Sequence, residues 1–246
     1  MPLNIEKKRI CQAIVNVFET GVPSGNYGAL AVLRDGAGFS YGRSQSTDGG
    51  DVLDEICFQY GNAKGAWSTV VAKHIERLVC DGTISLAPWT AGSYPASWPA
   101  WAIELADALR KAGTDPAMIA VQDRVFDERY WIPAAKQCDE MKLVLPLSWA
   151  AVYDTAIQSG PGRIWSMRAL FPQSPPSKGG SEKIWAQAYV TARHQWIAGF
   201  TGKDAAHTAA VRSTTYRMDA FDAFIAAGNW QLDTPLQIAR PKATIT

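Results

Sequence analysis

The sequence predicts a mainly α-helical fold with a small β element, arranged as two helical lobes around a cleft. Apolar residues recur at helical spacing along most of the chain, and only one short segment alternates like a strand. Apolar residues make up 47% of the 246 positions, enough for a sizeable core. We expect a single domain over residues 1–246, with one lobe of about 1–60 plus the C-terminal helices and another of 61–180.

The first expected helix covers residues 5–19. Ile10, Ile14, Val17 and Phe18 form one apolar stripe at helical spacing. The glycine at position 21 and the proline at 23 end the pattern. The sequence therefore predicts that the acidic residue at position 19 is the last one of the helix.

The segment from 28 to 45 changes character. An apolar run over 28–33 leads into a Gly-rich turn at 34–38 and then into the alternating run 39–41, which predicts a small hairpin. Asp51 follows two glycines and precedes an apolar run, so we expect it to be the N-cap of the next helix.

The rest of the chain is predicted to be mostly helical, with loops where proline, glycine and serine gather. Loops are expected at 87–99 and 172–181. Helices are expected at 67–80, 99–112, 115–140 with a break at Pro133, 147–158, 181–198 and 214–227.

Charge and composition exclude several classes of protein. Lysine and arginine number 24 against 23 acidic residues, which argues against a nucleic-acid partner. The longest uncharged run, 82–103, contains three prolines, which favours a surface loop over a membrane-spanning helix. No stable membrane association is therefore expected. The four cysteines lack metal-ligand spacing, so no metal site is expected. They resemble reduced core residues, although disulfides stay possible.

The N-terminal residues do not resemble a secretion signal. Three basic residues at 7–9 precede an apolar run over 10–18, but Gln12 and Asn16 interrupt that run and no small-residue cleavage site follows. We expect a monomer that is made in the cytoplasm without a Sec signal.

Two carboxylates flank the loop after the first helix. Glu19 ends the apolar helix and Asp35 lies sixteen residues later in a Gly-rich turn. An apolar helix end raises the pKa of a carboxyl group, whereas a solvated turn keeps it low. Hydrolysis of a glycosidic bond needs such a pair, one acid and one base, and no metal or organic cofactor. The alternative is a solvated helix end and an ordinary turn residue.

Ten tryptophans are compatible with a ligand that stacks on aromatic rings, such as a polysaccharide. Tyr27 and Trp98 are the candidate sugar-binding residues, with Trp89 and Trp101 close to the same Pro-rich loop. The alternative is a tryptophan-rich core.

The phrases Phe18–Gly21, Gly25–Gly28 and Asp35–Gly42 resemble the N-terminal motifs of family 46 glycoside hydrolases, the chitosanases of the lysozyme-like superfamily. The resemblance implies that Glu19 is the general acid and Asp35 the general base. It also implies that Ser40 replaces the usual threonine that positions water, and that Asp51 binds substrate.

A second stretch supports this resemblance. The phrases over 152–156 and 160–162 resemble the Tyr-Asp helix and the Gly-Pro-Gly that follows it, with Ser159 in place of a histidine. The resemblance implies that Asp154 joins two arginines in a buried ion network between the lobes. Arg193, on one helix face with Trp185 and Tyr189, and Arg217 are the candidates. The alternative is that each arginine lies along the surface.

The sequence departs from typical chitosanases at Ala37, where an arginine is common, and over residues 40–47. The latter phrase resembles chitosanase-fold domains of phage lysis proteins and type VI secretion toxins. Arg43 on the cleft wall would favour an anionic glycan. We therefore expect an inverting peptidoglycan hydrolase, resembling an endolysin or muramidase, that acts at the cell wall or periplasm after release. Chitosan hydrolysis and a non-catalytic glycan-binding module are the alternatives. An inverting mechanism predicts carboxyl groups about 6.5–9.5 Å apart or more.

Overall fold

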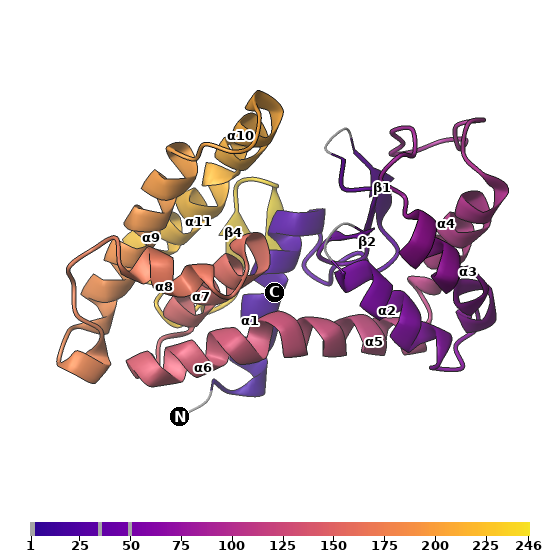
Figure 1. The fold of residues 1–246 in the computed structure, drawn as a ribbon. Coiled ribbons are helices and arrows are strands. Elements are labelled where there is room, and N and C mark those ends of the chain that lie inside the picture. The colour runs from indigo at the N-terminus through magenta and orange to yellow at the C-terminus, as the bar shows by residue number, and fades with distance from the viewer. Residues whose placement is uncertain (1–2, 34–35, 49–50) are drawn as a thin grey trace. The chain divides into compact units, whose positions relative to one another are not determined.

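The computed structural model describes residues 3–33, 36–48 and 51–246, which fall into two compact units (Figure 1). Unit 1 consists of Met1–Ser24 and Glu128–Thr246, and unit 2 is Gly25–Asp127. These bounds differ from the expected lobes, because α2 (Val52–Gly61) packs on α3 (Ser68–Asp81) and α5 (Pro116–Phe126) inside unit 2. The single catalytic domain stays a prediction. The mainly helical fold with a small sheet is confirmed.

Unit 2 contains the predicted hairpin. Strands β1 (Leu30–Val32), β2 (Phe39–Tyr41) and β3 (Ser46–Thr47) form an antiparallel sheet in that order. Leu30 is opposite Tyr41, and the register continues to Val32 opposite Phe39. The Tyr41 hydroxyl donates to the carbonyl of Leu109, which fixes β2 on α4 (Ala100–Ala112).

In the described part of unit 2, helices α2, α3, α4 and α5 pack their buried faces together. The helices at 68–81 and 100–112 begin one residue after the predicted positions, and α2 follows Asp51 as expected. Asp51 is the N-cap residue, as predicted, although its φ is 60° and its side chain makes no capping bond. The core of this unit includes Leu53, Ile56, Tyr60, Val71, Leu105, Leu109 and Met118.

Unit 1 is built on α1 (Ile5–Thr20), which is one residue longer than predicted. Asn4 caps its first turn through a bond from the Lys7 amide to its side chain, and Gly21, with φ 73°, ends the helix. The predicted stripe is buried and packs against α7 (Pro146–Ser159). The last residues of α1 are therefore held by the core of unit 1.

The remaining helices of unit 1 follow most of the predicted ranges. The helices expected at 147–158, 181–198 and 214–227 are observed within two residues of those bounds. They belong to a set that comprises α6 (Ile132–Met141), α7, α8 (Arg163–Arg168), α9 (Glu182–Ala198), α10 (Ala205–Arg212) and α11 (Tyr216–Ala226). Helices α9 and α11 lie side by side in orange and yellow (Figure 1). The short α8 and α10 and the hairpin of β4 (Leu236–Ile238) with β5 (Ala243–Ile245) were not predicted.

The predicted helix 115–140 is divided, but before Pro133. Helix α5 ends at Phe126, a π-helical segment η2 covers Asp127–Trp131, and Pro133 lies in the first turn of α6. A proline is tolerated in a first turn because the N–H that it lacks would have no partner within the helix.

The cysteines among the described residues are all free. Cys11, Cys57 and Cys138 are buried as expected, whereas Cys80 is exposed, so the core prediction is wrong for that residue. Burial raises the pKa of the Cys11 and Cys57 thiols far above the ordinary value, which keeps both protonated. Over residues 3–33, 36–48 and 51–246, no helix has the length and apolarity needed to cross a bilayer.

Gly113 permits a close approach of two backbone segments in unit 2. A Cβ atom added at Gly113 would lie 2.2 Å from the Cα of Gly28, in the loop that holds Tyr27. We expect Gly113→Ala to lower the free energy of unfolding by about 1–3 kcal/mol because the backbones must separate. Urea unfolding measures this effect. Gly162→Ala is the control, since open space surrounds Gly162 and its φ is −61°. Equal stability of the two variants would contradict the prediction.

Candidate active site

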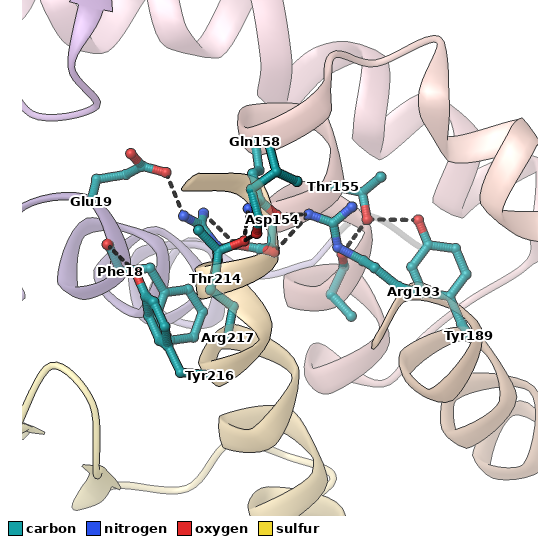
Figure 2. A network of polar contacts seen from close by, with 12 residues as sticks. Phe18, Glu19, Asp154, Thr155, Gln158, Tyr189, Arg193, Thr214, Tyr216 and Arg217 are labelled. Atoms are coloured by element: carbon teal, nitrogen blue, oxygen red, sulfur yellow. Dashed lines mark hydrogen bonds and ion pairs between the residues drawn. The ribbon is translucent and has the colours of Figure 1, made fainter. Parts of the chain in front are cut away.

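Glu19 lies in the last turn of α1, and its carboxylate is ion-paired (Figure 2). Its side chain is 16% exposed, and its Oε1 accepts a bond from Nη1 of Arg217 at 2.8 Å. The sequence predicted apolar surroundings made by Val17 and Phe18. Both are buried, but the guanidinium makes that description of the site wrong.

Arg217 joins Glu19 to a buried ion network. Its Nε and Nη2 both donate to Oδ1 of Asp154, at 2.9 and 2.6 Å, and Nη2 of Arg193 lies 3.2 Å from Oδ2 of the same carboxylate. Figure 2 shows this row of side chains from α1, α7, α9 and α11. The structure therefore brings together the three residues that the resemblance implied. All of them lie within unit 1, not between two lobes.

The charges in this network balance. Two guanidinium groups face the carboxylates of Asp154 and Glu19, and the side chains of Asp154 and Arg193 are fully buried. Burial alone would lower the pKa of Arg217, but the charges of Asp154 and Glu19 raise it above its ordinary value. Burial lowers the pKa of Arg193, and Asp154 opposes this. Removing one member would leave a buried charge without compensation.

Tyr216 also fixes the end of α1, and the sequence analysis gave it no role. Its hydroxyl donates to the carbonyl of Phe18 at 3.1 Å, and its ring meets the Phe18 ring edge-on. The guanidinium of Arg217 lies 5.1 Å from the Phe18 ring centroid. The sequence feature that could have identified Tyr216 as part of the site is its position directly before Arg217.

The second predicted carboxylate, Asp35, lies outside the described residues, as does Arg34. The predicted separation between Glu19 and Asp35 therefore stays a prediction. Ser40 lies in β2, opposite Ala31 and Thr47, and is 3% exposed.

Thr83 fixes the start of strand β2. Its hydroxyl accepts from the amide of Phe39 and donates to Oδ2 of Asp48, both at 2.8 Å. The Thr83 amide also donates to the same carboxylate oxygen. The start of β2 is therefore fixed to the loop after α3.

Arg43 is not a free cation. It is 3% exposed, its Nη1 lies 3.0 Å from Oδ1 of Asp123, and its guanidinium packs against the rings of Tyr27 and Phe126. The Tyr27 hydroxyl donates to the same Asp123 oxygen at 2.7 Å. Burial raises the pKa of Tyr27 to about 12, opposed by the charge of Arg43, so its hydroxyl stays protonated. The expectation of a charged Arg43 facing a glycan is wrong because Asp123 neutralises it.

Asp48, Asp51 and Asp54 form a group of carboxylates around the start of α2, where Glu55 also lies in the first turn. Asp51 is exposed, Asp48 is buried against Thr83, and Asp54 is half-buried. Burial and the charges of Asp48 and Asp51 raise the pKa of Asp54 above its ordinary value. No group of three His, Cys, Asp or Glu residues in the described part of the chain has the arrangement needed for a metal ion. The cluster is a site of concentrated negative charge, and a cationic ligand would relieve its repulsion.

Trp98 is a core residue. It is 4% exposed, its indole N–H donates to the carbonyl of Ala87, and its ring packs on Phe39, Trp89 and Tyr94. Trp89 is 6% exposed, so neither ring offers a free face to a sugar, and the expected stacking role of Trp98 is wrong for this conformation. Trp101 is partly exposed, and its sugar-binding role stays a prediction, as does that of Tyr27.

This chain is similar to known proteins over most of its length. Residues 13–236 match the family described as glycosyl hydrolase family 46. The chain is 27% identical over 250 residues to a chitosanase of Bacillus subtilis (strain 168), covering 96% of this chain and 83% of that protein.

Solved structures share the fold. A native chitosanase from Bacillus subtilis MY002 has a TM-score of 0.79 at 23% identity, covering 99% of this chain and all of the other. A family 46 chitosanase of Gynuella sunshinyii in complex with chitotetraose has a TM-score of 0.77 at 22% identity, covering 99% and 98%. The match over 13–236 extends from α1, which carries Glu19, through α11, which carries Arg217. This chain therefore belongs to glycosyl hydrolase family 46 and is a glycoside hydrolase with the chitosanase fold.

Proposed function

We propose that this protein hydrolyses the β-1,4 bonds of chitosan, with Glu19 as the general acid and Asp35 as the general base. The observation that carries the proposal is the ion-paired Glu19 at the end of α1 in a chain of family 46. The resemblance of the N-terminal motifs assigns the acid to this residue. Relatives named chitosanases support chitosan as the substrate.

The charge distribution of unit 2 supports a cationic substrate. Chitosan carries an ammonium group on each glucosamine unit, and Asp48, Asp51 and Asp54 place negative charge around the start of α2. Asp51 contributes the exposed carboxylate of this group, and that carboxylate is not used for helix capping. Arg43, which had favoured an anionic glycan, is neutralised by Asp123.

In the proposed mechanism, Glu19 donates its proton to the bridging oxygen while the bond from that oxygen to the anomeric carbon breaks. Asp35 accepts a proton from a water molecule whose oxygen attacks the anomeric carbon from the opposite face, and Ser40 helps to hold this water. The product has the inverted configuration. Glu19 is left ionised and Asp35 protonated, and exchange with solvent resets both. Arg217 holds the Glu19 carboxylate that remains after the transfer.

Peptidoglycan hydrolysis, the function favoured by the sequence, has no support from the comparisons, which name chitosanases. Action at the cell wall after release without a Sec signal stays a prediction, as does the monomeric state. A non-catalytic glycan-binding module is an outcome that the experiment below distinguishes.

Glu19→Gln keeps the shape of the side chain and removes the proton. We expect the rate of release of reducing sugar from chitosan to fall by about 10²–10⁴-fold, the usual contribution of a general acid. Glu6→Gln, in the first turn of the same helix, is the matched control and should keep full activity. Clearing of permeabilised Gram-negative cell walls is measured in parallel. Clearing without chitosan hydrolysis would overturn the proposed substrate, and binding without hydrolysis of either glycan would indicate a binding module.

Asp51→Asn tests the contribution of the exposed carboxylate. We expect KM for chitosan to rise about threefold to tenfold with a smaller change in kcat, because the lost attraction acts on a charged substrate. The effect should shrink as salt concentration increases. Asp139→Asn, exposed on α6, is the control for a change in net charge. An unchanged KM at low salt would exclude Asp51 from substrate binding.

Asp54→Asn tests the cost of holding the Asp54 carboxylate half-buried and beside the charges of Asp48 and Asp51. The raised pKa of Asp54 means that the folded state favours its protonated form, so wild-type stability falls as pH rises through that pKa. The asparagine variant has no carboxyl group at this position, so its stability does not fall in this way. Its free energy of unfolding should exceed that of wild type near pH 7, and this difference should become smaller below the ordinary carboxyl pKa. Urea unfolding at one pH near 7 and one below that pKa measures the difference. A difference that is the same at both would refute the electrostatic cause.

A further inference from the structure

Beyond Arg193, the buried network continues to a glutamine that neither the sequence analysis nor the resemblance identified. Nη2 of Arg193 donates to Oε1 of Gln158, on the last turn of α7, as well as to Asp154. Nε2 of Gln158 donates to the hydroxyl of Thr214 at 2.6 Å, and that hydroxyl donates to the carbonyl of Val211 at 2.6 Å. Figure 2 shows Gln158 beside Asp154.

The hydrogen bonds fix which way the Gln158 amide faces. The Thr214 hydroxyl has one proton, which it gives to Val211, so it acts as an acceptor toward Gln158. The amide NH₂ must therefore face Thr214, which leaves the amide oxygen facing Arg193. An isolated glutamine could turn over, but this one presents an acceptor to the guanidinium.

Arg193 depends on this acceptor. Its side chain is fully buried, and its Nε and Nη1 make no hydrogen bond to any of the residues that the structure describes. It is held through Nη2, which Asp154 and Gln158 share. Without Gln158, Asp154 would be the remaining partner of a buried cation, and the two groups would move to shorten their contact.

A shift of Asp154 would move Glu19 through a single intervening residue, Arg217. One carboxylate oxygen of Asp154 holds two nitrogens of Arg217, and a third nitrogen of Arg217 holds Glu19. Gln158 also has no charge, so it supplies an acceptor for Arg193 and leaves the balance of two cations and two carboxylates unchanged.

We infer that Gln158, oriented by Thr214, is a positioning residue that fixes the Glu19 carboxyl group through Arg193, Asp154 and Arg217. The inference rests on the proposed function, because Glu19 is the general acid in that proposal. Gln158 reaches no reacting atom in this arrangement. Its effect on the reaction is therefore on the placement of the acid and not on the binding of the glycan.

Gln158→Met keeps the length of the side chain and removes both hydrogen bonds. We expect kcat on chitosan to fall about tenfold or more while KM stays within about twofold, because the acid is misplaced and the binding surface is intact. Thr214→Val should lower kcat in the same way, and Thr214→Ser should restore it. Gln187→Met, on α9, is the control. This glutamine bonds to Asp222 outside the network and should keep wild-type activity.

The double variant Gln158→Met with Thr214→Val shows whether Thr214 acts through Gln158 or whether the two residues affect kcat independently. If the residues act in series, the double variant loses no more kcat than Gln158→Met alone, whereas multiplied losses would overturn the inference. Thermal unfolding establishes that each assay is made on folded protein. If Gln158→Met does not fold, the comparison of Thr214→Val with Thr214→Ser decides. Unchanged kcat in the folded variants, or a rise in KM alone, would overturn the inference.

A second readout does not depend on turnover. The ¹³C chemical shift of the Glu19 carboxyl carbon, measured at a fixed pH, should change in Gln158→Met because the contact between Glu19 and Arg217 changes. An identical chemical shift in the two proteins would refute the positioning role even if wild type does not cleave chitosan. Failure of the proposed substrate and failure of this inference are therefore observed separately.

Discussion

The contact on which the rest of the site depends is the one between Arg217 and Asp154, inside unit 1. One carboxylate oxygen binds two guanidinium nitrogens at 2.9 and 2.6 Å, in surroundings that are almost fully buried. This fixes the plane of the guanidinium and leaves its remaining nitrogen to hold Glu19. Because an ion pair buried in this way is costly when broken, α7 and α11 cannot shift independently without exposing a charge.

The apolar core and the ion network of unit 1 support each other. Phe18 packs edge-on against Phe221 and Tyr216, and the Tyr216 hydroxyl binds the Phe18 carbonyl. Glu19 follows directly, so the packing that buries the apolar stripe of α1 also sets where the carboxylate lies. A carboxyl group on a loop would lack this support, and the site gains precision from its place on a helix.

Unit 2 distributes its charges differently. Arg43 and Asp123 neutralise each other against Tyr27, and Asp48 is satisfied by Thr83. Asp51 and Asp54 remain as negative charge near the start of α2, and burial together with the charges of Asp48 and Asp51 raises the pKa of Asp54. This negative charge is the electrostatic basis of the proposal of a cationic substrate.

By itself, the sequence determined the helical class and the range of α1 to within one residue, and its resemblance to a known family identified Asp154, Arg193 and Arg217. Periodicity and motifs are local, and helices longer than ten residues express them clearly. Only the tertiary structure determined which side chains contact one another and which are buried. Glu19 met a guanidinium where its neighbours in sequence predicted an apolar site, and Arg43 and Trp98 were buried where exposure was expected. Gln158 belongs to the network, but an uncharged glutamine forms no charge pattern that would identify it from the sequence. Partners that are 198 residues apart, as Glu19 and Arg217 are, are brought together by packing, and no local pattern records that contact.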